Sequence, residues 1–181
     1  MPSSRDTDFS PVEIPLRDGR RVILRNVMAQ DREKMLAALR ALSAESRYSR
    51  FMAALREPTP QMLERATRPD PQRELQLVAV AGEGDEQRIV GGARYGAGAQ
   101  SKECEFAVTV VDDWQGQGLA RELLKALMGA ARARGFERME GFILASNARM
   151  LALANRLGFL PAESPEGPSV QRVVCDLTRL G

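Results

Sequence analysis

Two glycines and two glutamines stand where an apolar run gives way to an amphipathic helical pattern. Residues 115–120 read QGQGLA and follow the apolar FAVTVV of residues 106–111. The first amides of a helix have no intrahelical acceptors, and the helix dipole adds positive potential there. Glycines let a phosphate approach such amides closely, so residues 116–121 can present converging N–H donors to a phosphate. A plain tight turn at Gly116 and Gly118 is the alternative.

Three known phosphate loops can be compared with this segment. A Walker A loop needs Gly-Lys-Ser/Thr, whereas Leu119, Ala120 and Arg121 stand there, and a dinucleotide fingerprint needs a third glycine that is missing. The (Gln/Arg)-x-x-Gly-x-(Gly/Ala) loop of the GCN5-related N-acetyltransferases is matched throughout, by Gln115, Gly116, Gln117, Gly118, Leu119 and Ala120. In that family the loop holds the pyrophosphate of coenzyme A. The resemblance implies acetyl-CoA as co-substrate, with Arg121 and Lys125 either meeting its phosphates or forming a solvated helix face.

Further segments carry the same resemblance. Residues 146–159, SNARMLALANRLGF, resemble a second conserved segment in which an asparagine, here Asn147, opens a helix ending in Leu-Gly-Phe. Residues 16–31, 42–51 and 103–120 resemble the acetyltransferase domain of bacterial Pat-type protein lysine acetyltransferases. The similarity implies a GNAT-like α+β fold. That fold is a single-domain mixed, largely antiparallel twisted sheet with helices on both faces and a splayed central strand pair.

Hydrophobic periodicity predicts the elements that position these motifs. We expect a strand hairpin around Asp18-Gly19 and further strands at 74–81, 87–95, 103–111, 136–145 and 169–177. Helices are expected at 29–42, 44–55, 59–67, 120–134 and 148–157. Residues 1–10 are expected to form a flexible N-terminal segment and residues 11–181 a single domain. This order predicts a sheet that is antiparallel at its start and contains a β-α-β unit in its second half.

The resemblance places the pantetheine arm beside Val108, Val110 and Val111, where a backbone N–H near Val110 would polarise the thioester carbonyl. The acceptor amine is harder to accommodate. A lysine-like amine with a pKa of about 10.4 is neutral at pH 7 only at a cost of roughly 4–5 kcal/mol. A neighbouring carboxylate can accept its proton directly or through water. Pat-type domains carry a glutamate in a Glu-Phe-Ala-Val run, here Glu105; an ordinary exposed strand glutamate is the alternative, and Glu103 is the reserve.

No proton donor for the departing thiolate is marked by a motif. Many family members carry a tyrosine seven residues after the asparagine, and that position is Ala154 here. The two tyrosines, Tyr48 and Tyr95, lie in other segments. Water, or no acid at all, is expected, because a thiol with a pKa of about 8.5 is already a fair leaving group. Asn147 is expected to be a helix N-cap first, and a ligand to the pantetheine or to a catalytic water second.

Other side chains permit weaker expectations. In the family fold the first helices of the chain form one wall of the acceptor site, so Arg47 and Arg50 could contact an acidic stretch of the acceptor. Trp114 is expected to pack at the base of the loop. Cys104 and Cys175 are expected to be buried thiols, because nothing in the sequence positions either as a nucleophile.

The composition argues against several other classes of function. The 181 residues are 44% hydrophobic and 28% charged with a net charge of +2, too little to argue for nucleic acid or an anionic membrane as partner. No apolar run approaches the roughly 18 residues of a membrane span. Histidine, the commonest metal ligand and general base, is absent, so no metal is expected. A polar N-terminus without a secretory signal and only two cysteines favour the cytoplasm.

We therefore expect an acetyl-CoA-dependent N-acetyltransferase that transfers the acetyl group directly to a primary amine within a ternary complex. The Pat-type resemblance favours a protein lysine as acceptor. A small-molecule amine acetyltransferase is one alternative. A non-catalytic acyl-CoA-binding regulatory module, suggested by Ala154, is the other. Nothing in the sequence indicates an oligomeric state.

Overall fold

Eight strands form one sheet in the computed structural model, which describes residues 9–51 and 57–180. The strands are β1 (Val12–Pro15), β2 (Arg21–Asn26), β3 (Glu74–Ala81), β4 (Arg88–Gly96), β5 (Glu103–Val110), β6 (Arg138–Leu144), β7 (Leu160–Ala162) and β8 (Val170–Asp176). Their order in space is β1-β2-β3-β4-β5-β6-β8-β7. Only β5 and β6 pair in parallel; the other pairs are antiparallel. This confirms the expected mixed, largely antiparallel sheet.

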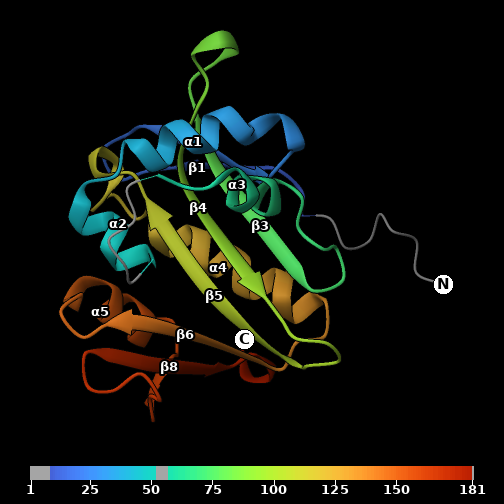
Figure 1. Ribbon diagram of the computed structural model, residues 1–181, viewed down its shortest axis with the longest axis vertical. Coiled ribbons are helices and arrows are strands. Elements are labelled where there is room, and N and C mark those ends of the chain that lie inside the picture. Colours follow the sequence, from blue (N-terminus) through green and yellow to red (C-terminus); the bar gives the residue numbers. More distant parts are fainter. Residues whose placement is uncertain (1–8, 52–56, 181) are drawn as a thin grey trace.

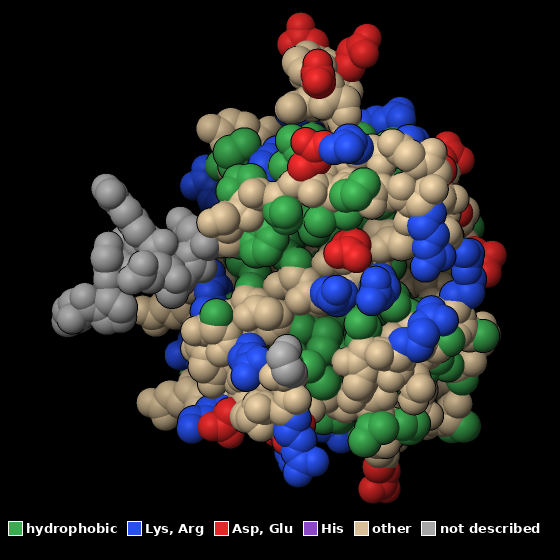
Figure 2. Space-filling view, turned by 180° about the vertical axis from the view of Figure 1, so that it is seen from behind, with side chains coloured by type: hydrophobic (Ala, Val, Ile, Leu, Met, Phe, Trp, Pro, Cys, Tyr) green, Lys and Arg blue, Asp and Glu red, His purple; other side chains and the backbone are tan. Residues whose placement is uncertain are grey.

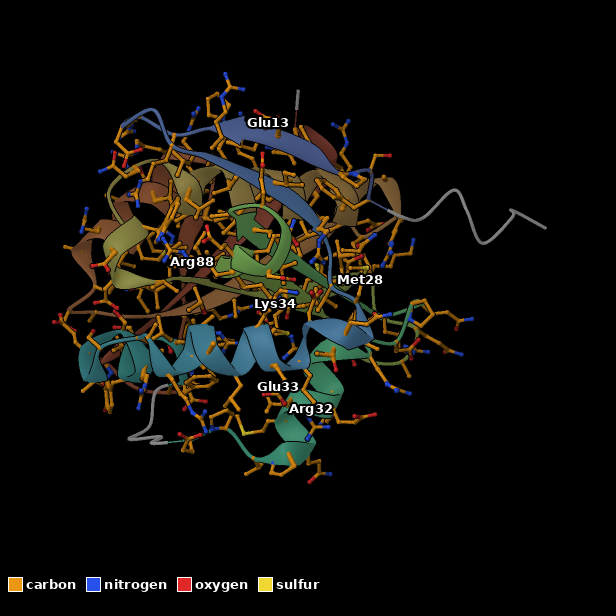
Figure 3. The ribbon with its side chains drawn as sticks, turned by 90° about the horizontal axis from the view of Figure 1, so that it is seen from above. Glu13, Met28, Arg32, Glu33, Lys34 and Arg88 are labelled. Carbon is orange, nitrogen blue, oxygen red and sulfur yellow. The ribbon has the colours of Figure 1, made fainter. Side chains whose placement is uncertain are left out.

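Helices cover both faces of this sheet (Figure 1). They are α1 (Arg32–Arg40), α2 (Ala44–Phe51), α3 (Pro60–Thr67), α4 (Leu119–Ala133) and α5 (Ala148–Arg156), with short 3₁₀ turns at Ala29–Asp31, Gly84–Glu86, Asp112–Trp114 and Leu177–Arg179. Seen from above, α1 and its labelled Arg32, Glu33 and Lys34 lie along one side of the molecule, and Glu13 of β1 lies on the other (Figure 3). The sheet and α4 lie between them, so α1–α3 and α4 cover opposite faces.

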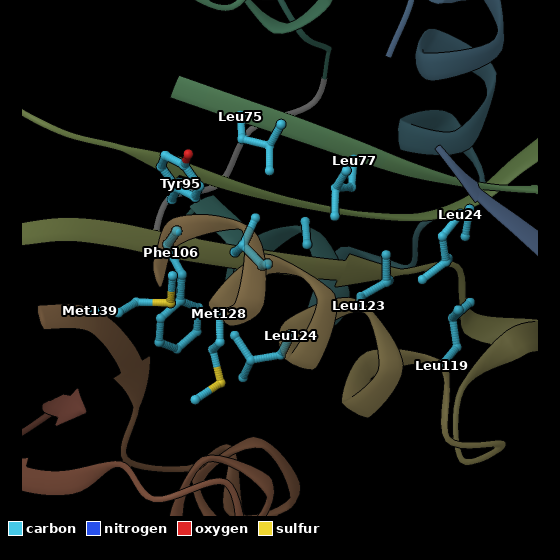
Figure 4. Packing of buried hydrophobic residues seen from close by; sticks show 14 of the residues in the cluster. Leu24, Leu75, Leu77, Tyr95, Phe106, Leu119, Leu123, Leu124, Met128 and Met139 are labelled. Carbon is cyan, nitrogen blue, oxygen red and sulfur yellow. The ribbon is translucent and has the colours of Figure 1, made fainter. Parts of the chain in front are cut away.

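The main core lies between α4 and the sheet (Figure 4). The buried residues of α4 are Leu119, Leu123, Leu124, Leu127, Met128 and Ala131, and they meet Leu75, Leu77, Tyr95 and Phe106 from the strands. The sequence pattern predicts most of this helix face. Ala120 is half-buried, while Leu119 and Met128 are fully packed. Each fully buried leucine contributes about 1.5–3 kcal/mol through apolar burial, so this face anchors α4 and the loop that precedes it.

The middle of the sheet is buried on both faces, as its apolar strands indicate. Along β3, Leu75, Leu77 and Ala79 belong to the core under α4, whereas Val78 and Val80 form a smaller cluster on the α1 side. Two layers of apolar packing therefore hold the central strands.

The structure differs from the sequence-based expectations at one strand, and two further expectations extend beyond the described residues. Strand β7 (Leu160–Ala162) was not expected, because three residues containing Pro161 show no alternation and a proline is tolerated only at a sheet edge. The helix expected at 44–55 is described as far as Phe51, and residues 52–56 lie outside the described residues. The flexible segment expected at residues 1–10 falls mainly on residues 1–8, which also lie outside them.

The surface carries both signs of charge. Figure 2 shows Lys and Arg side chains interspersed with hydrophobic and acidic ones on the face that it presents. The turn between β3 and β4 projects from the body (Figure 1), and acidic side chains gather at its tip. These acids are Glu83, Asp85 and Glu86.

Candidate active site

Strands β5 and β6 diverge after a short stretch of parallel pairing. Their register ends where Glu105 lies opposite Glu140, and the strands separate beyond that point (Figure 1). The Phe106 ring lies over Gly141, where an added Cβ would be 2.2 Å from Phe106 Cε1. The same ring meets Phe159 edge-on, with ring centroids 5.0 Å apart. The missing side chain of Gly141 thus lets an aromatic ring stand where the strands part, which gives the expected splayed pair.

A cleft of about 770 Å³ occupies this opening, and its walls come from β5, the loop after it, α2 and α5. Most of the expected site residues line it: Glu105, Val108, Val110, Gln115, Gly116, Gly118, Leu119, Ala120, Arg121 and Asn147. Val111 and Gln117 lie outside this lining. The alternation along the strand turns the Val111 side chain to the opposite face. The Gln117 carbonyl accepts a hydrogen bond from the Arg17 backbone N–H at 3.2 Å.

The backbone of β5 presents alternate peptide groups to the cleft. The Val111 N–H donates to the Val90 carbonyl of the strand on the other side at 2.9 Å. In an antiparallel pair the neighbouring residues point their N–H and C=O groups the other way. Val110 and Val108 therefore direct their amides away from β4 and toward the cleft. The Val110 carbonyl is already engaged, because it accepts a hydrogen bond from Gln115 Nε2 at 3.0 Å.

The loop after β5 ends in bare backbone at the start of α4. Gly116 has φ +77° and Gly118 has φ +92°, a left-handed conformation that favours glycine. Gly118 is the N-cap of α4 and offers no side-chain cap. The first amides of this fifteen-residue helix therefore lack intrahelical acceptors at the positive end of its dipole. This arrangement suits an anionic ligand.

Three arginines surround the loop and line the cleft: Arg17, Arg121 and Arg149. A Cβ on Gly116 would lie 2.9 Å from Arg149 Nη2, and one on Gly118 would lie 3.8 Å from Arg17 Nε. Both guanidinium groups therefore rest close to the glycines and add positive charge where the helix begins. Only Arg121 was expected from the sequence. Arg17 and Arg149 come from the β1–β2 turn and from α5, and only the fold brings them to the loop.

Hydrogen bonds tie α2 to the same loop. Asp112 Oδ1 accepts from the Ser43 backbone N–H at 3.0 Å, and its Oδ2 accepts from Ser46 Oγ at 3.2 Å. Gln115 Nε2 donates to Ser46 Oγ at 3.2 Å as well as to Val110. Partial burial opposes ionisation of Asp112, but the hydrogen bonds from the two serines prevail and lower its pKa. The Gln115 side chain therefore links β5 to α2 instead of pointing freely into the cleft.

The structure distinguishes between the two candidates for the general base, Glu103 and Glu105. Glu103 forms an ion pair with Arg138 at 3.2 Å and lies outside the cleft lining. Glu105 lines the cleft, and its pKa is raised, first by partial burial and then by Glu140, against the opposing effect of two arginines. A carboxyl whose pKa is raised holds a proton more readily than an ordinary glutamate. That property suits a group that takes a proton from an amine.

These features agree with a family match. The sequence profile of the acetyltransferase (GNAT) domain covers residues 21–160. The chain belongs to the GNAT acetyltransferase family. It is therefore an acetyltransferase that uses acetyl-CoA.

Relatives of this GNAT chain were found by sequence and by structure. The acetyltransferase PA5475 of Pseudomonas aeruginosa is 36% identical over 169 residues, which cover 91% of both chains. The acetyltransferase Pat of Mycolicibacterium smegmatis is 32% identical over 151 residues, 83% of this chain and 44% of Pat. The crystal structure of the GNAT domain of S. lividans PAT superposes with a TM-score of 0.84 at 28% identity, covering 92% of this chain and 96% of that one.

At the position where many GNAT enzymes carry a tyrosine, this chain has an alanine that is not exposed. Ala154 is fully buried in the core. The Tyr95 hydroxyl accepts a hydrogen bond from Arg134 Nη1 at 3.0 Å, and Tyr48 is exposed; neither lines the cleft. Asn147 fulfils its first expected role, because its Oδ1 caps α5 by accepting from the Met150 backbone N–H at 3.2 Å.

The remaining expectations concern residues beside the site. Trp114 is buried at the base of the loop, with the Arg20 guanidinium 3.8 Å above its ring. Both cysteines are buried and unpaired, and burial together with Glu140 raises the pKa of Cys104 to about 12, so its thiolate is not accessible near neutral pH. Among the described residues no group of His, Cys, Asp or Glu could hold a metal ion. No helix in the described ranges is long and apolar enough to cross a membrane.

Proposed function

We propose that this chain transfers the acetyl group of acetyl-CoA directly to the ε-amine of a protein lysine, with Glu105 as the general base. The observation that carries the proposal is the position of Glu105 in the cleft, on the strand whose amides at Val108 and Val110 face the same space. The protein acceptor rests on the Pat-type resemblance of the sequence, and two of the relatives, one found by sequence and one by structure, are named Pat.

At the coenzyme end, the amides of residues 116–121 would hold the diphosphate of acetyl-CoA. The α4 dipole and the guanidinium groups of Arg17, Arg121 and Arg149 add favourable charge there. The pantetheine arm would then follow β5. The Val110 N–H is directed at the cleft, where it can stabilise the negative charge that develops on the thioester oxygen.

At the acceptor end, the reaction needs a neutral amine. Glu105 takes a proton from the ammonium group directly or through one water. The amine nitrogen then bonds to the thioester carbon and gives up its second proton to water as the carbon–sulfur bond breaks. Coenzyme A leaves as a thiolate that takes a proton from water, so the one net proton released is the one held by Glu105. Removing the amine proton costs roughly 4–5 kcal/mol at pH 7 for a pKa of about 10.4. Because the pKa of Glu105 is raised, it lies closer to the pKa of the amine than that of an ordinary glutamate does. Transfer of the proton to Glu105 is then less unfavourable.

A small-molecule amine is the second candidate acceptor. A further cavity of about 330 Å³ lies between the sheet and α1–α3, a size that suits a compact ligand. The two free, buried cysteines fit a reducing compartment, and we propose a cytoplasmic location for either reaction.

The test is a cell lysate incubated with the enzyme and isotope-labelled acetyl-CoA, analysed by mass spectrometry of proteins and of metabolites. Matched incubations use the wild-type chain and Glu105→Gln. Label on protein lysines that depends on Glu105 supports the proposal. Label on metabolites alone would assign the second candidate. Glu105-independent labelling in either fraction would remove Glu105 from the mechanism.

A further inference from the structure

Two arginines flank Glu105 on the face of the sheet that α1–α3 cover. Arg50 lies near the end of α2, and Arg94 lies on β4 directly opposite Ala107 of β5. Both act electrostatically on Glu105, lowering its pKa against the effects of burial and Glu140. Arg50 lines both the cleft and the second cavity, and Arg94 lines the second cavity. The pair therefore stands beside the proposed base, at the cavities through which it can be reached.

The guanidinium groups of Arg50 and Arg94 make few interactions with other side chains. In the part of the chain that the structure describes, Arg50 forms no hydrogen bond or ion pair, and it rests 4.8 Å from the centroid of the Phe51 ring. Arg94 has one distant carboxylate, Glu74, at 3.8 Å. Arg47, one turn before Arg50, is different, because it donates to two backbone carbonyls of α1 at 3.2 and 3.0 Å. Arg50 is therefore the arginine of α2 that remains available to a ligand.

The surroundings make an unpaired cation at Arg50 unfavourable. Burial, reinforced by the charge of Arg94, lowers the pKa of Arg50 to about 10. The second cavity also has apolar walls, including Leu39, Leu42 and Val78. Charges attract more strongly across such walls than in water. The planar guanidinium fork matches a carboxylate in two parallel hydrogen bonds. Glu105 cannot serve as this counter-ion throughout the reaction if it is to receive the amine proton.

We propose that the acceptor carries a carboxylate close to its reactive amine, and that this carboxylate binds between Arg50 and Arg94. The inference rests on the proposed function and names the acceptor more closely: the modified lysine is flanked by an aspartate or glutamate. A free amino acid would offer the same chemistry from a different source. The carboxylate orients the acceptor by binding the two arginines, and the amine then reaches Glu105 on the adjoining strand.

The experiment compares matched acceptors with the whole chain. The peptides are acetyl-Ala-Glu-Lys-Glu-Ala-amide and its counterpart with both glutamates replaced by glutamine; L-lysine and L-lysinamide form the small-molecule pair. Release of free thiol from acetyl-CoA gives kcat/KM for each acceptor. Versions of both peptides with norleucine in place of lysine measure binding without chemistry. The variants are Arg50→Gln and Arg94→Gln, with thermal unfolding as the check that each is folded.

Arg179→Gln is the control for non-specific attraction, because it removes the same charge from a side chain that is 86% exposed and lies outside the lining of both cavities. We expect the wild type to prefer the acidic peptide by about tenfold or more in kcat/KM, as a charge-assisted contact predicts. Arg50→Gln and Arg94→Gln should each remove most of that preference, and the Arg179→Gln chain should keep it. The acidic norleucine peptide should follow the same order in binding.

The outcomes separate this inference from the proposed function. Equal kcat/KM for both peptides, with equal binding of their norleucine forms, would overturn the carboxylate inference and leave lysine acetylation standing. Turnover of L-lysine over L-lysinamide without turnover of either peptide would support the carboxylate contact and overturn the protein acceptor. A preference for acidic peptides that Arg179→Gln weakens as much as Arg50→Gln would also overturn the inference, because net charge would then explain it.

Discussion

The two proposed ends of the site differ in the groups that they offer to a ligand. At the proposed coenzyme end, these are mainly backbone amides of one contiguous stretch, from Val108 to Arg121. At the proposed acceptor end, they are side chains of separate elements, namely Arg50 of α2 and Glu105 of β5 in the cleft and Arg94 of β4 in the second cavity. Contiguous backbone donors can be identified from residue spacing alone. Side chains from separate elements form a site only after the sheet has brought them together.

A short hydrogen-bonded network connects the two ends. Asp112 and Gln115 belong to the coenzyme side, and both bind Ser46 of α2. One helical turn further along α2 lies Arg50, at the acceptor side. The loop that is expected to hold acetyl-CoA therefore also supports the wall that faces the acceptor.

The largest effect should come from the base at the acceptor end. Glu105→Gln is expected to lower kcat/KM by about 10²–10⁴, the usual contribution of a general base. Because the pKa of Glu105 is raised, the wild type should lose activity as pH falls through a pKa above the usual glutamate value. That acidic limb should be absent from the residual activity of the variant. Steady-state thiol release across pH measures both effects.

Glu103→Gln is the matched control, since Glu103 lies two residues away on the same strand, pairs with Arg138 and stays outside the cleft. Its turnover should stay close to that of the wild type. Equal losses in both variants would mean that the strand, and not the base, had been damaged. Acetyl-CoA affinity measured by calorimetry should survive in Glu105→Gln, because the carboxylate acts at the other end.

The next effect should appear at the coenzyme end. Gly118→Val places a β-branched residue at φ +92°, in a conformation that costs a side-chain-bearing residue about 1–2 kcal/mol and displaces the first amides of α4. We expect acetyl-CoA affinity to fall by about fivefold to thirtyfold, since each 1.4 kcal/mol is tenfold. Isothermal titration measures it. Unaltered affinity would refute binding of the diphosphate by this loop.

A smaller effect is expected where the strands diverge. Gly141→Ala would place a Cβ 2.2 Å from the Phe106 ring and should lower the free energy of unfolding by about 1–3 kcal/mol, the usual cost of overpacking. Gly129→Ala is the control, because nothing lies within 4 Å of its Cβ position in α4, and it should raise stability by about 0.5–1 kcal/mol. Urea unfolding of both variants checks the difference, and equal stabilities would contradict the role of the aromatic ring.

The smallest effect tests the link between the ends. Asp112→Asn weakens the acceptor of two hydrogen bonds from α2 and should raise the acceptor KM several-fold, about 1 kcal/mol. Asp113→Asn removes the same charge from the next residue, whose backbone carbonyl, and not its carboxylate, accepts the bond from Arg20 at 3.0 Å. It should leave the acceptor KM unchanged. Identical kinetics of the two variants would show that the ends act independently.

Local patterns predicted the elements that carry the coenzyme end. Strand β5 runs from Glu103 to Val110, close to its expected range of 103–111, and the inner face of α4 follows the spacing of its leucines. These succeed because periodicity of burial and helix capping are properties of neighbouring residues. Strand β7 was missed because its pairing with β8 at the sheet edge, and no local pattern, makes it a strand.

The sequence by itself determined the fold class and the glycine loop that opens α4, and it predicted Glu105 as the candidate base with Glu103 as the reserve, since each depends on residues close in the chain or on a family motif. Only the tertiary structure decided that Gly141 accommodates Phe106, that Arg17 and Arg149 meet at the loop, and that Arg50 is available while Arg47 is not. The physical reason is that burial and electrostatic partnership depend on which distant segments the sheet makes neighbours. The spacing of residues within one segment does not show which distant segments will become its neighbours.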